Sequence, residues 1–217
     1  MKSYAVIGLG RFGRRIAERL YAYGEDVLVI DRSENTINEI ADRVTKAVCA
    51  DATDKGVLKR VGVQDCDCAI VGLGSDLASS ILITMSLKNM GVPMIICKAF
   101  DETHREILEK IGADQVILAE KEVADKMART LASPGILESI ELSTDYGIVE
   151  YRTPAGWVGK SIRELDIRAR YGVNVIAIEQ KNGDIDVSPD PNAPIESDMI
   201  LVLLGDYGKL EKIQKMK

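Results

Sequence analysis

Short apolar runs alternate with amphipathic stretches of helical period over residues 3–118. Nearly every residue of these runs is apolar, which is typical of parallel strands covered by helices on both faces. Such even alternation predicts a parallel sheet with right-handed crossovers, which is a doubly wound α/β domain. The expected strands are residues 4–7, 27–30, 47–49, 68–71, 94–97 and 115–118, and the expected helices are residues 11–23, 34–43, 54–60, 76–90 and 101–111.

The pattern changes after residue 119. Residues 120–131 have the period of an amphipathic helix, which Ser133, Pro134 and Gly135 interrupt, and we expect an apolar helical stripe to resume over residues 136–140. We therefore interpret residues 120–142 as bridging or crossover helices. An exposed apolar helix here would mark a subunit contact, and a helix folded back on its own sheet fits the periodicity equally well.

Residues 143–217 have the pattern of a small α+β domain with its own hairpin. Asn182-Gly183 favours a tight turn between two strands, and a proline-rich loop follows them. We expect strands at residues 147–152, 173–180, 185–188 and 199–204, a short helix at residues 160–166 and a closing helix. The predicted organisation is thus a nucleotide-binding type of domain at residues 1–119, the bridge at 120–142 and the α+β domain at 143–217.

A glycine-rich loop carries the strongest functional signal. Gly8, Gly10 and Gly13 belong to Gly8-Leu9-Gly10-Arg11-Phe12-Gly13, directly after the first expected strand and at the start of the first helix. The first glycine permits a tight turn, the second lets a phosphate approach the backbone, and the third allows close packing of helix and strand. Asp31 ends the second strand, where an acidic group accepts hydrogen bonds from ribose hydroxyls. This context predicts a Rossmann-like nucleotide site.

Further residues are expected at the same carboxyl edge of the sheet, where open α/β folds bind ligands. We expect the residues after the third strand to reach an adenine, and a glycine pair after the fourth to allow close approach of a ligand. Arg32 would lie against an adenine face or meet a phosphate. The candidate residues are Arg32, Asp51, Ala52, Thr53, Gly72, Gly74, Ser75, Lys98 after the fifth strand and Glu120 after the sixth.

Composition excludes several classes of protein. The formal net charge is −6, and no basic excess marks a surface for DNA or RNA, so we expect no nucleic-acid partner. No apolar run approaches the length of a membrane span, so we expect no direct insertion into a membrane. The chain reaches its first strand without a basic or cleavable leader, and its four cysteines suit a reducing compartment, so we expect a cytoplasmic protein.

The sequence offers little for catalysis. A hydride-transferring enzyme needs an acid or base beside the nicotinamide, yet the chain has no Tyr-x-x-x-Lys pair and a single histidine, His104. His104 lies in a surface-like polar run, and we interpret it as a helix-start residue rather than a catalyst. A nucleotide site without evident chemistry favours a sensor, and we expect no catalytic residues.

These motifs resemble those of the RCK (regulating conductance of potassium) domain followed by its companion RCK-C domain, also called TrkA-N and TrkA-C. The likeness covers essentially the whole chain and is greatest to the cytosolic regulatory subunits of Trk/Ktr-type bacterial potassium uptake systems. The residues that carry it are 5–13, 50–53, 109–114, Glu120-Lys121, 159–165 and 168–175.

The resemblance implies a non-enzymatic gating protein. Family members form homodimers that assemble to an octameric ring beneath a membrane-embedded potassium-translocating subunit of the TrkH or KtrB type, at the inner face of the cell membrane. They bind ATP or ADP, and some bind NAD(H), in the glycine-loop site. The resemblance further implies that Arg11 reads the terminal phosphate and that Glu120 belongs to a nucleotide-linked Mg²⁺ or Ca²⁺ site.

Some of these C-terminal domains also bind cyclic di-AMP between two subunits. The corresponding positions here are Ile167, Arg168, Asn174 and Val175, with Pro191 in the neighbouring loop.

Two other functions stay open at this point. An NAD-dependent oxidoreductase of unknown substrate would have a substrate pocket in the second domain. A nucleotide-sensing transcription regulator would need a basic helix-turn-helix segment, which the sequence lacks. The sequence does not rank ATP against NADH, and it does not say whether the nucleotide opens or closes a pore.

Overall fold

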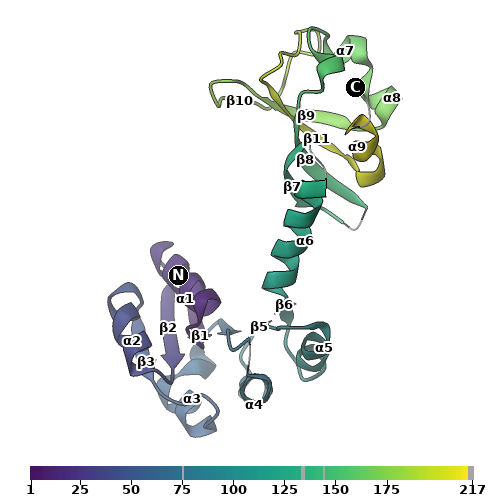
Figure 1. Ribbon diagram of the computed structural model, residues 1–217. Coiled ribbons are helices and arrows are strands. Elements are labelled where there is room, and N and C mark those ends of the chain that lie inside the picture. The colour runs from purple at the N-terminus through teal and green to yellow at the C-terminus, as the bar shows by residue number, and fades with distance from the viewer. Residues whose placement is uncertain (75, 133–134, 144, 215–217) are drawn as a thin grey trace. The chain divides into compact units, whose positions relative to one another are not determined.

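The apolar runs of the N-terminal half form a six-stranded parallel sheet in the computed structural model, which describes residues 1–74, 76–132, 135–143 and 145–214 (Figure 1). The strands are β1 (Ser3–Ile7), β2 (Asp26–Asp31), β3 (Lys46–Cys49), β4 (Cys68–Val71), β5 (Ile95–Lys98) and β6 (Gln115–Ile117). The connecting helices are α1 (Arg11–Ala22), α2 (Glu34–Ile40), α3 (Lys55–Val61), α4 (Leu77–Asn89) and α5 (Glu102–Lys110).

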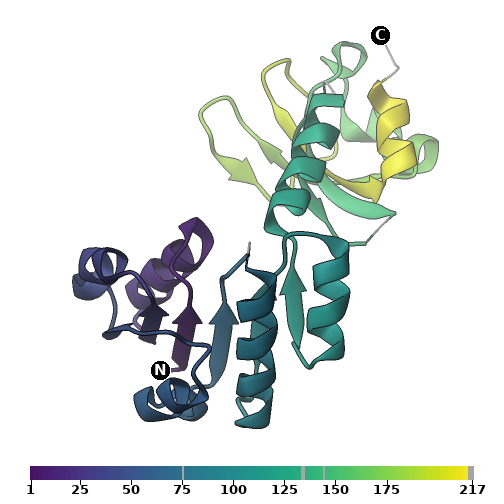
Figure 2. The same cartoon turned by 60° about the horizontal axis from the view of Figure 1, so that its bottom comes forward.

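Different helices cover the two faces of this sheet (Figure 2). Consecutive strand residues point to opposite faces, so Val6 and Ile7 of β1 enter different cores. The core around Val6 is closed by α1 and α2, and the core around Ile7 is closed by α3, α4 and α5. The predicted doubly wound α/β fold is confirmed.

The strand order determines where the carboxyl edge of the sheet has a crevice. The order is β3-β2-β1-β4-β5-β6, so the chain leaves β1 toward one side and returns to β4 on the other. Between β1 and β4 the crossovers diverge, and the carboxyl ends of the two strands leave a crevice there. The loop after β1 and the loop after β4 both lie at this crevice.

The chain divides into two compact units, Met1–Glu122 and Val123–Lys217. The boundary falls within α6 (Ala119–Ala132), so this helix belongs to both. The second unit holds a five-stranded sheet in the order β10-β9-β11-β8-β7, all antiparallel. Its elements are β7 (Ile136–Glu141), β8 (Tyr146–Arg152), α7 (Ile162–Leu165), α8 (Ile167–Tyr171), β9 (Asn174–Glu179), β10 (Ile185–Asp186), β11 (Ile200–Asp206) and α9 (Tyr207–Gln214).

Two predictions about this half of the chain need correction. The expected helical stripe over residues 136–140 is wrong, because this segment is strand β7 and pairs with β8. Its apolar residues fit either period, and pairing with a neighbouring strand decides between them. The helix α8 was not expected; it follows α7 directly through Asp166, which takes a left-handed conformation with φ 45°. Ser133 and Pro134 lie outside the described residues.

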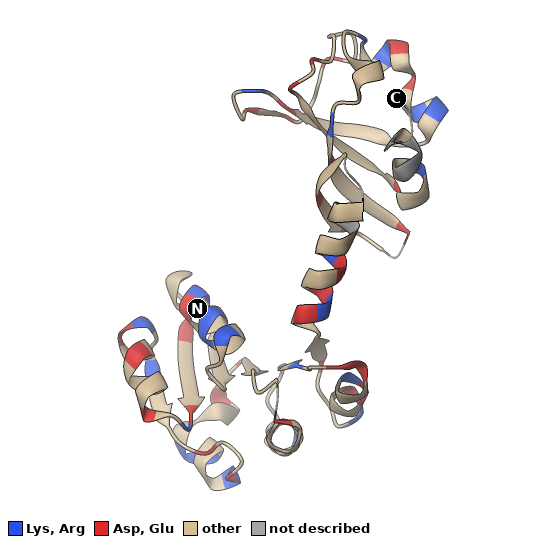
Figure 3. Ribbon diagram, viewed as in Figure 1, with Lys and Arg blue, Asp and Glu red and all other residues tan. Residues whose placement is uncertain are grey.

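Residues of both charge signs occur along the helices of both units (Figure 3). None of the helices in the described part of the chain combines the length and the apolar character needed to cross a bilayer. Cys66, Cys68 and Cys97 are buried, and burial raises the pKa of the Cys68 and Cys97 thiols to about 11. Cys49 is exposed, at the end of the edge strand β3.

His104 starts a helix as predicted, but it does not lie on the surface. Its backbone N–H donates to the Oδ1 of Asp101, which caps α5, at 2.7 Å. Its ring is 1% exposed and contacts Ser80 Oγ through Nε2 at 3.2 Å. Burial lowers the pKa of His104 below its ordinary value of 6.5, and the charge of Asp101 opposes part of this effect.

We expect this buried histidine to make the first unit less stable in mild acid. A lowered pKa in the folded state means that the unfolded chain binds the proton more tightly, so stability is full above pH 6.5 and falls as the pH drops below it. Urea unfolding between pH 7.5 and 5.5 measures the slope. The His104→Gln variant does not titrate in this range and should lose that slope, since the chain has no other histidine. An equal slope in both proteins would contradict this assignment.

Candidate functional site

The glycine loop packs backbone directly against backbone. Gly8 has φ +88°, and its N–H donates to Ile30 O at 2.9 Å. A Cβ on Gly13 would lie 2.0 Å from Gly8 O, and a Cβ on Gly72 would lie 2.8 Å from the same oxygen. No side chain fits at Gly13 without moving the loop. Gly13 and Gly72 therefore bring the start of α1 and the end of β4 against the loop after β1.

Gly10 differs from these three. It precedes α1 with φ −60° and ψ 179°, a conformation open to any residue, and a Cβ there would meet no atom within 4 Å. The protein itself does not require a glycine at this position. Open space beside the first turn of a helix is what the close approach of a phosphate needs.

Asp31 secures the loop from the neighbouring strand. Its Oδ2 accepts a hydrogen bond from the Leu9 N–H at 2.7 Å, and its Oδ1 accepts one from the Ser33 N–H at 2.8 Å. The sequence predicted a ribose-binding role for this carboxylate. Each oxygen keeps a further lone pair for such a bond, so the two roles are compatible.

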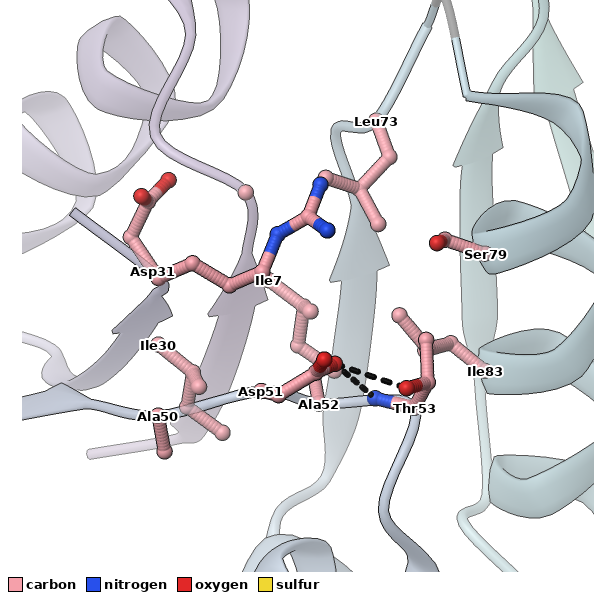
Figure 4. A pocket seen from close by; sticks show the side chains of 12 residues that line it. Ile7, Ile30, Asp31, Ala50, Asp51, Ala52, Thr53, Leu73, Ser79 and Ile83 are labelled. Atoms are coloured by element: carbon pink, nitrogen blue, oxygen red, sulfur yellow. Dashed lines mark hydrogen bonds between the residues drawn. The ribbon is translucent and has the colours of Figure 1, made fainter.

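A small cavity of about 80 Å³ lies beside this loop (Figure 4). It has an apolar floor and a polar rim, to which Arg32 also contributes. On the rim, Asp51 Oδ1 accepts hydrogen bonds from the Thr53 hydroxyl at 2.7 Å and the Thr53 N–H at 2.9 Å. These two bonds hold the pKa of the Asp51 carboxyl below its ordinary value. The lining residues are Ile7, Gly8, Ile30, Asp31, Arg32, Ala50, Asp51, Ala52, Thr53, Leu73, Ser79 and Ile83.

Arg32 forms an ion pair at the rim rather than standing alone. Its Nη2 lies 3.4 Å from Asp76 Oδ2. Asp76 caps α4 by accepting from the Ser79 N–H at 3.1 Å, and that bond is the main reason why the pKa of Asp76 is lowered. The sequence analysis missed Asp76 and Ser79; the start of a helix after the fourth strand was the signal that would have found them.

A second cluster of charge lies at the ends of β5 and β6. The Nζ of Lys98 is 2.5 Å from Oε1 of Glu120, and it lies 5.8 Å from the ring centroid of Phe12. A Cβ on Gly74 would lie 3.3 Å from the end of the Lys98 side chain. The Lys98 hydrogen bond holds the pKa of Glu120 below its ordinary value, and the charge of Arg11 adds to this. The structure thus brings together five predicted site residues, which are Arg11, Phe12, Gly74, Lys98 and Glu120.

The remaining predicted positions are placed as follows. Ser75 lies outside the described residues. In the second unit, Arg168, Asn174 and Pro191 are exposed and Val175 is half-buried. Ile167 is 2% exposed and belongs to the core of the second unit.

Comparison with known proteins now adds to this geometry. Residues 4–119 match the TrkA-N domain, and residues 148–217 match the TrkA-C domain. The chain belongs to the TrkA-N/TrkA-C family. The RCK resemblance seen in the sequence is thereby confirmed.

Two proteins of Bacillus subtilis (strain 168) are similar over nearly their whole length. The chain is 37% identical over 214 residues to Ktr system potassium uptake protein C, covering 99% of this chain and 96% of that protein. It is 38% identical over 213 residues to Ktr system potassium uptake protein A, covering 98% and 96%. The solved structure of the GsuK channel bound to NAD matches with a TM-score of 0.64 at 19% identity, over 96% of this chain and 38% of that chain. At that identity the likeness shows the fold.

Gly13 and Gly10 should respond differently to replacement by alanine. Gly13→Ala should destabilise the first unit by about 3 kcal/mol, because its Cβ collides with backbone that cannot rotate away. Gly10→Ala should change the free energy of unfolding by less than about 0.5 kcal/mol. Urea denaturation of both variants measures this difference, and equal stabilities would contradict the packing described for Gly13.

Proposed function

We propose that this chain is the regulatory subunit of a potassium uptake system, and that it responds to an adenine nucleotide bound at the carboxyl edge of its parallel sheet. Full-length kinship to the Ktr system proteins A and C supports the link to potassium uptake. The observation that supports a nucleotide is the open space beside Gly10, together with the cavity at Asp51 and the cations Arg11 and Lys98 at the same edge of the sheet.

Each part of a nucleotide has a matching region. The ribose would meet Asp31, and the adenine would enter the cavity at Asp51 and Thr53. The phosphates would lie against Gly10 and the start of α1, with Arg11 and Lys98 next to the terminal phosphate. ATP, ADP and NAD(H) share the adenosine and the pyrophosphate. They therefore differ mainly in the chemical group that would lie next to Arg11 and Lys98.

A divalent cation fits this site only together with the nucleotide. Within the described residues, no three His, Cys, Asp or Glu side chains gather to hold a metal ion. Glu120 alone would contribute a carboxylate oxygen, and phosphate oxygens would complete the oxygen-rich shell that Mg²⁺ and Ca²⁺ prefer. The cation would supply positive charge between Glu120 and the phosphates, which otherwise repel each other.

We propose a sensor rather than an oxidoreductase. His104 is fully buried between α4 and α5 and bonded to Ser80, where no substrate could receive its proton. This burial counts against the only histidine as an acid or base in hydride transfer.

Two exposed apolar faces support self-association. On α6, Val123, Met127 and Leu131 follow one another at a spacing of four residues and are 63%, 60% and 76% exposed. On α4, Leu82 and Met85 are also exposed. One self-complementary contact closes a homodimer, and a second, different contact joins dimers into a ring.

We therefore propose a homodimer that assembles to an octameric ring. The ring would dock on the cytoplasmic side of a membrane-embedded potassium-translocating subunit of the TrkH or KtrB type. A ligand would shift this assembly only by its different affinity for two states of the ring. Cyclic di-AMP is the proposed second ligand, held between two second units by Arg168, Asn174, Val175 and Pro191.

A panel of ligands tests the proposal by thermal unfolding, with ATP, ADP, NADH and cyclic di-AMP, each with and without Mg²⁺. One nucleotide should stabilise the protein most, by about 2.7 kcal/mol at a hundred times its dissociation constant. Gly10→Leu should abolish this effect while leaving a folded protein and an unchanged response to cyclic di-AMP. The control, Ala22→Leu, places the same side chain at the exposed end of α1. Nucleotide responses retained in Gly10→Leu would show that the loop is only a structural turn.

Two further variants test how the terminal phosphate is read. Arg11→Ala and Glu120→Gln should both narrow the gap between the affinities for ATP and ADP, the second mainly by removing the dependence on divalent cations. Loss of one charge-assisted contact should weaken ATP binding by about 1.5–3 kcal/mol, roughly ten- to hundredfold.

Isothermal titration calorimetry with Mg²⁺ and with EDTA measures both effects. Arg15→Ala removes an exposed arginine one turn further along α1 and serves as the control. If both test variants bind ATP and ADP as the unaltered protein does, Arg11 and Glu120 take no part in sensing the phosphate.

A further inference from the structure

The carboxylate of Glu120 lies beside two cations at the site where a terminal phosphate is expected. Oε1 of Glu120 is 2.5 Å from the Lys98 ammonium, and the charge of Arg11 also acts on it. Both cations belong to the carboxyl edge, since Lys98 ends β5 and Arg11 begins α1. Without a ligand, the charge of Lys98 is already neutralised by a residue of the chain itself.

The two members of this ion pair are held very differently. The Lys98 side chain is 15% exposed, with its end against Gly74 and its charge above the Phe12 ring. The Glu120 side chain is 69% exposed in the first turn of α6. The ammonium is therefore fixed in position, whereas the carboxylate can swing into water.

This asymmetry decides which group is exchanged. A largely buried ammonium that loses its partner is strongly destabilised, so Lys98 will keep an anion beside it. An exposed carboxylate that leaves such a pair loses at most about 1 kcal/mol. A phosphate oxygen carries more negative charge than a carboxylate oxygen, and it would take the same place beside the ammonium.

We propose that Glu120 is an internal stand-in for a phosphate: its carboxylate occupies Lys98 in the free protein, and the terminal phosphate of a bound nucleotide takes over Lys98 and releases Glu120. This inference rests on the proposed nucleotide site and deepens it, because it makes Lys98 a specificity-determining residue. A nucleotide whose phosphate does not reach Lys98 leaves the ion pair intact. The released residue belongs to the first turn of α6, the helix that continues into the second unit.

A double-mutant cycle on the full chain tests the exchange. Calorimetry in EDTA measures ATP binding to the unaltered protein, Lys98→Met, Glu120→Gln and the double variant. Glu120→Gln should tighten ATP binding by about three- to tenfold, because no ion pair has to be broken. Lys98→Met should weaken it by about ten- to hundredfold. When Glu120→Gln is added to Lys98→Met, its effect should be at least about threefold smaller.

The second unit offers a matched control pair. Lys181 and Asp198 form an ion pair of 2.6 Å, and Lys181→Met with Asp198→Asn should leave ATP binding unchanged. Thermal unfolding checks that every variant is folded.

Each other result has a distinct meaning. If Glu120→Gln has the same effect with and without Lys98, or weakens ATP binding in EDTA, Glu120 does not stand in for a phosphate and the exchange is wrong. If the unaltered protein binds ATP neither in EDTA nor in Mg²⁺, the proposed nucleotide site is wrong and the exchange falls with it.

Discussion

The close contact between Gly13 and Gly8 is the constraint on which the site depends. Because no Cβ fits between the first turn of α1 and the carbonyl of Gly8, the helix starts directly on the backbone that leaves β1. Gly72 brings the loop after β4 against the same carbonyl. Of the glycines of this loop, Gly10 is left uncovered, and the space beside it is where we propose that a phosphate comes near the start of a helix.

The charges around this crevice are satisfied within the protein. Asp31 accepts two backbone N–H groups, Asp51 holds the Thr53 hydroxyl, and Glu120 neutralises Lys98. In the proposed nucleotide site, a ligand would therefore meet several polar groups that already have partners, and its net binding energy would be the difference between new and old contacts. Sites of this kind can discriminate between ligands by charge, since only a stronger anion displaces the partner that is already there.

The proposed regulatory role needs this local exchange to reach other subunits. The helix α6 has Glu120 in its first turn, within the first unit, and continues past Val123 into the second. Its exposed apolar residues and those of α4 lie in separate units and provide two surfaces for further copies. A change at the start of α6 could then bias one arrangement of an assembly over another, which is the thermodynamic content of regulation by a ligand.

The sequence by itself determined the doubly wound fold, its six strands, and the glycine loop with Asp31, because both the period of apolar residues and the glycine spacing are local properties. Local properties could not determine whether residues 136–141 form a helix or a strand, because their apolar residues suit both. Pairing with β8 makes this segment the strand β7. They also hid the burial of His104, which depends on how α5 packs on α4, and the pairing of Lys98 with Glu120 across 22 residues. Only the tertiary structure decided these features, since each depends on groups that meet when strands and helices distant in the chain come together.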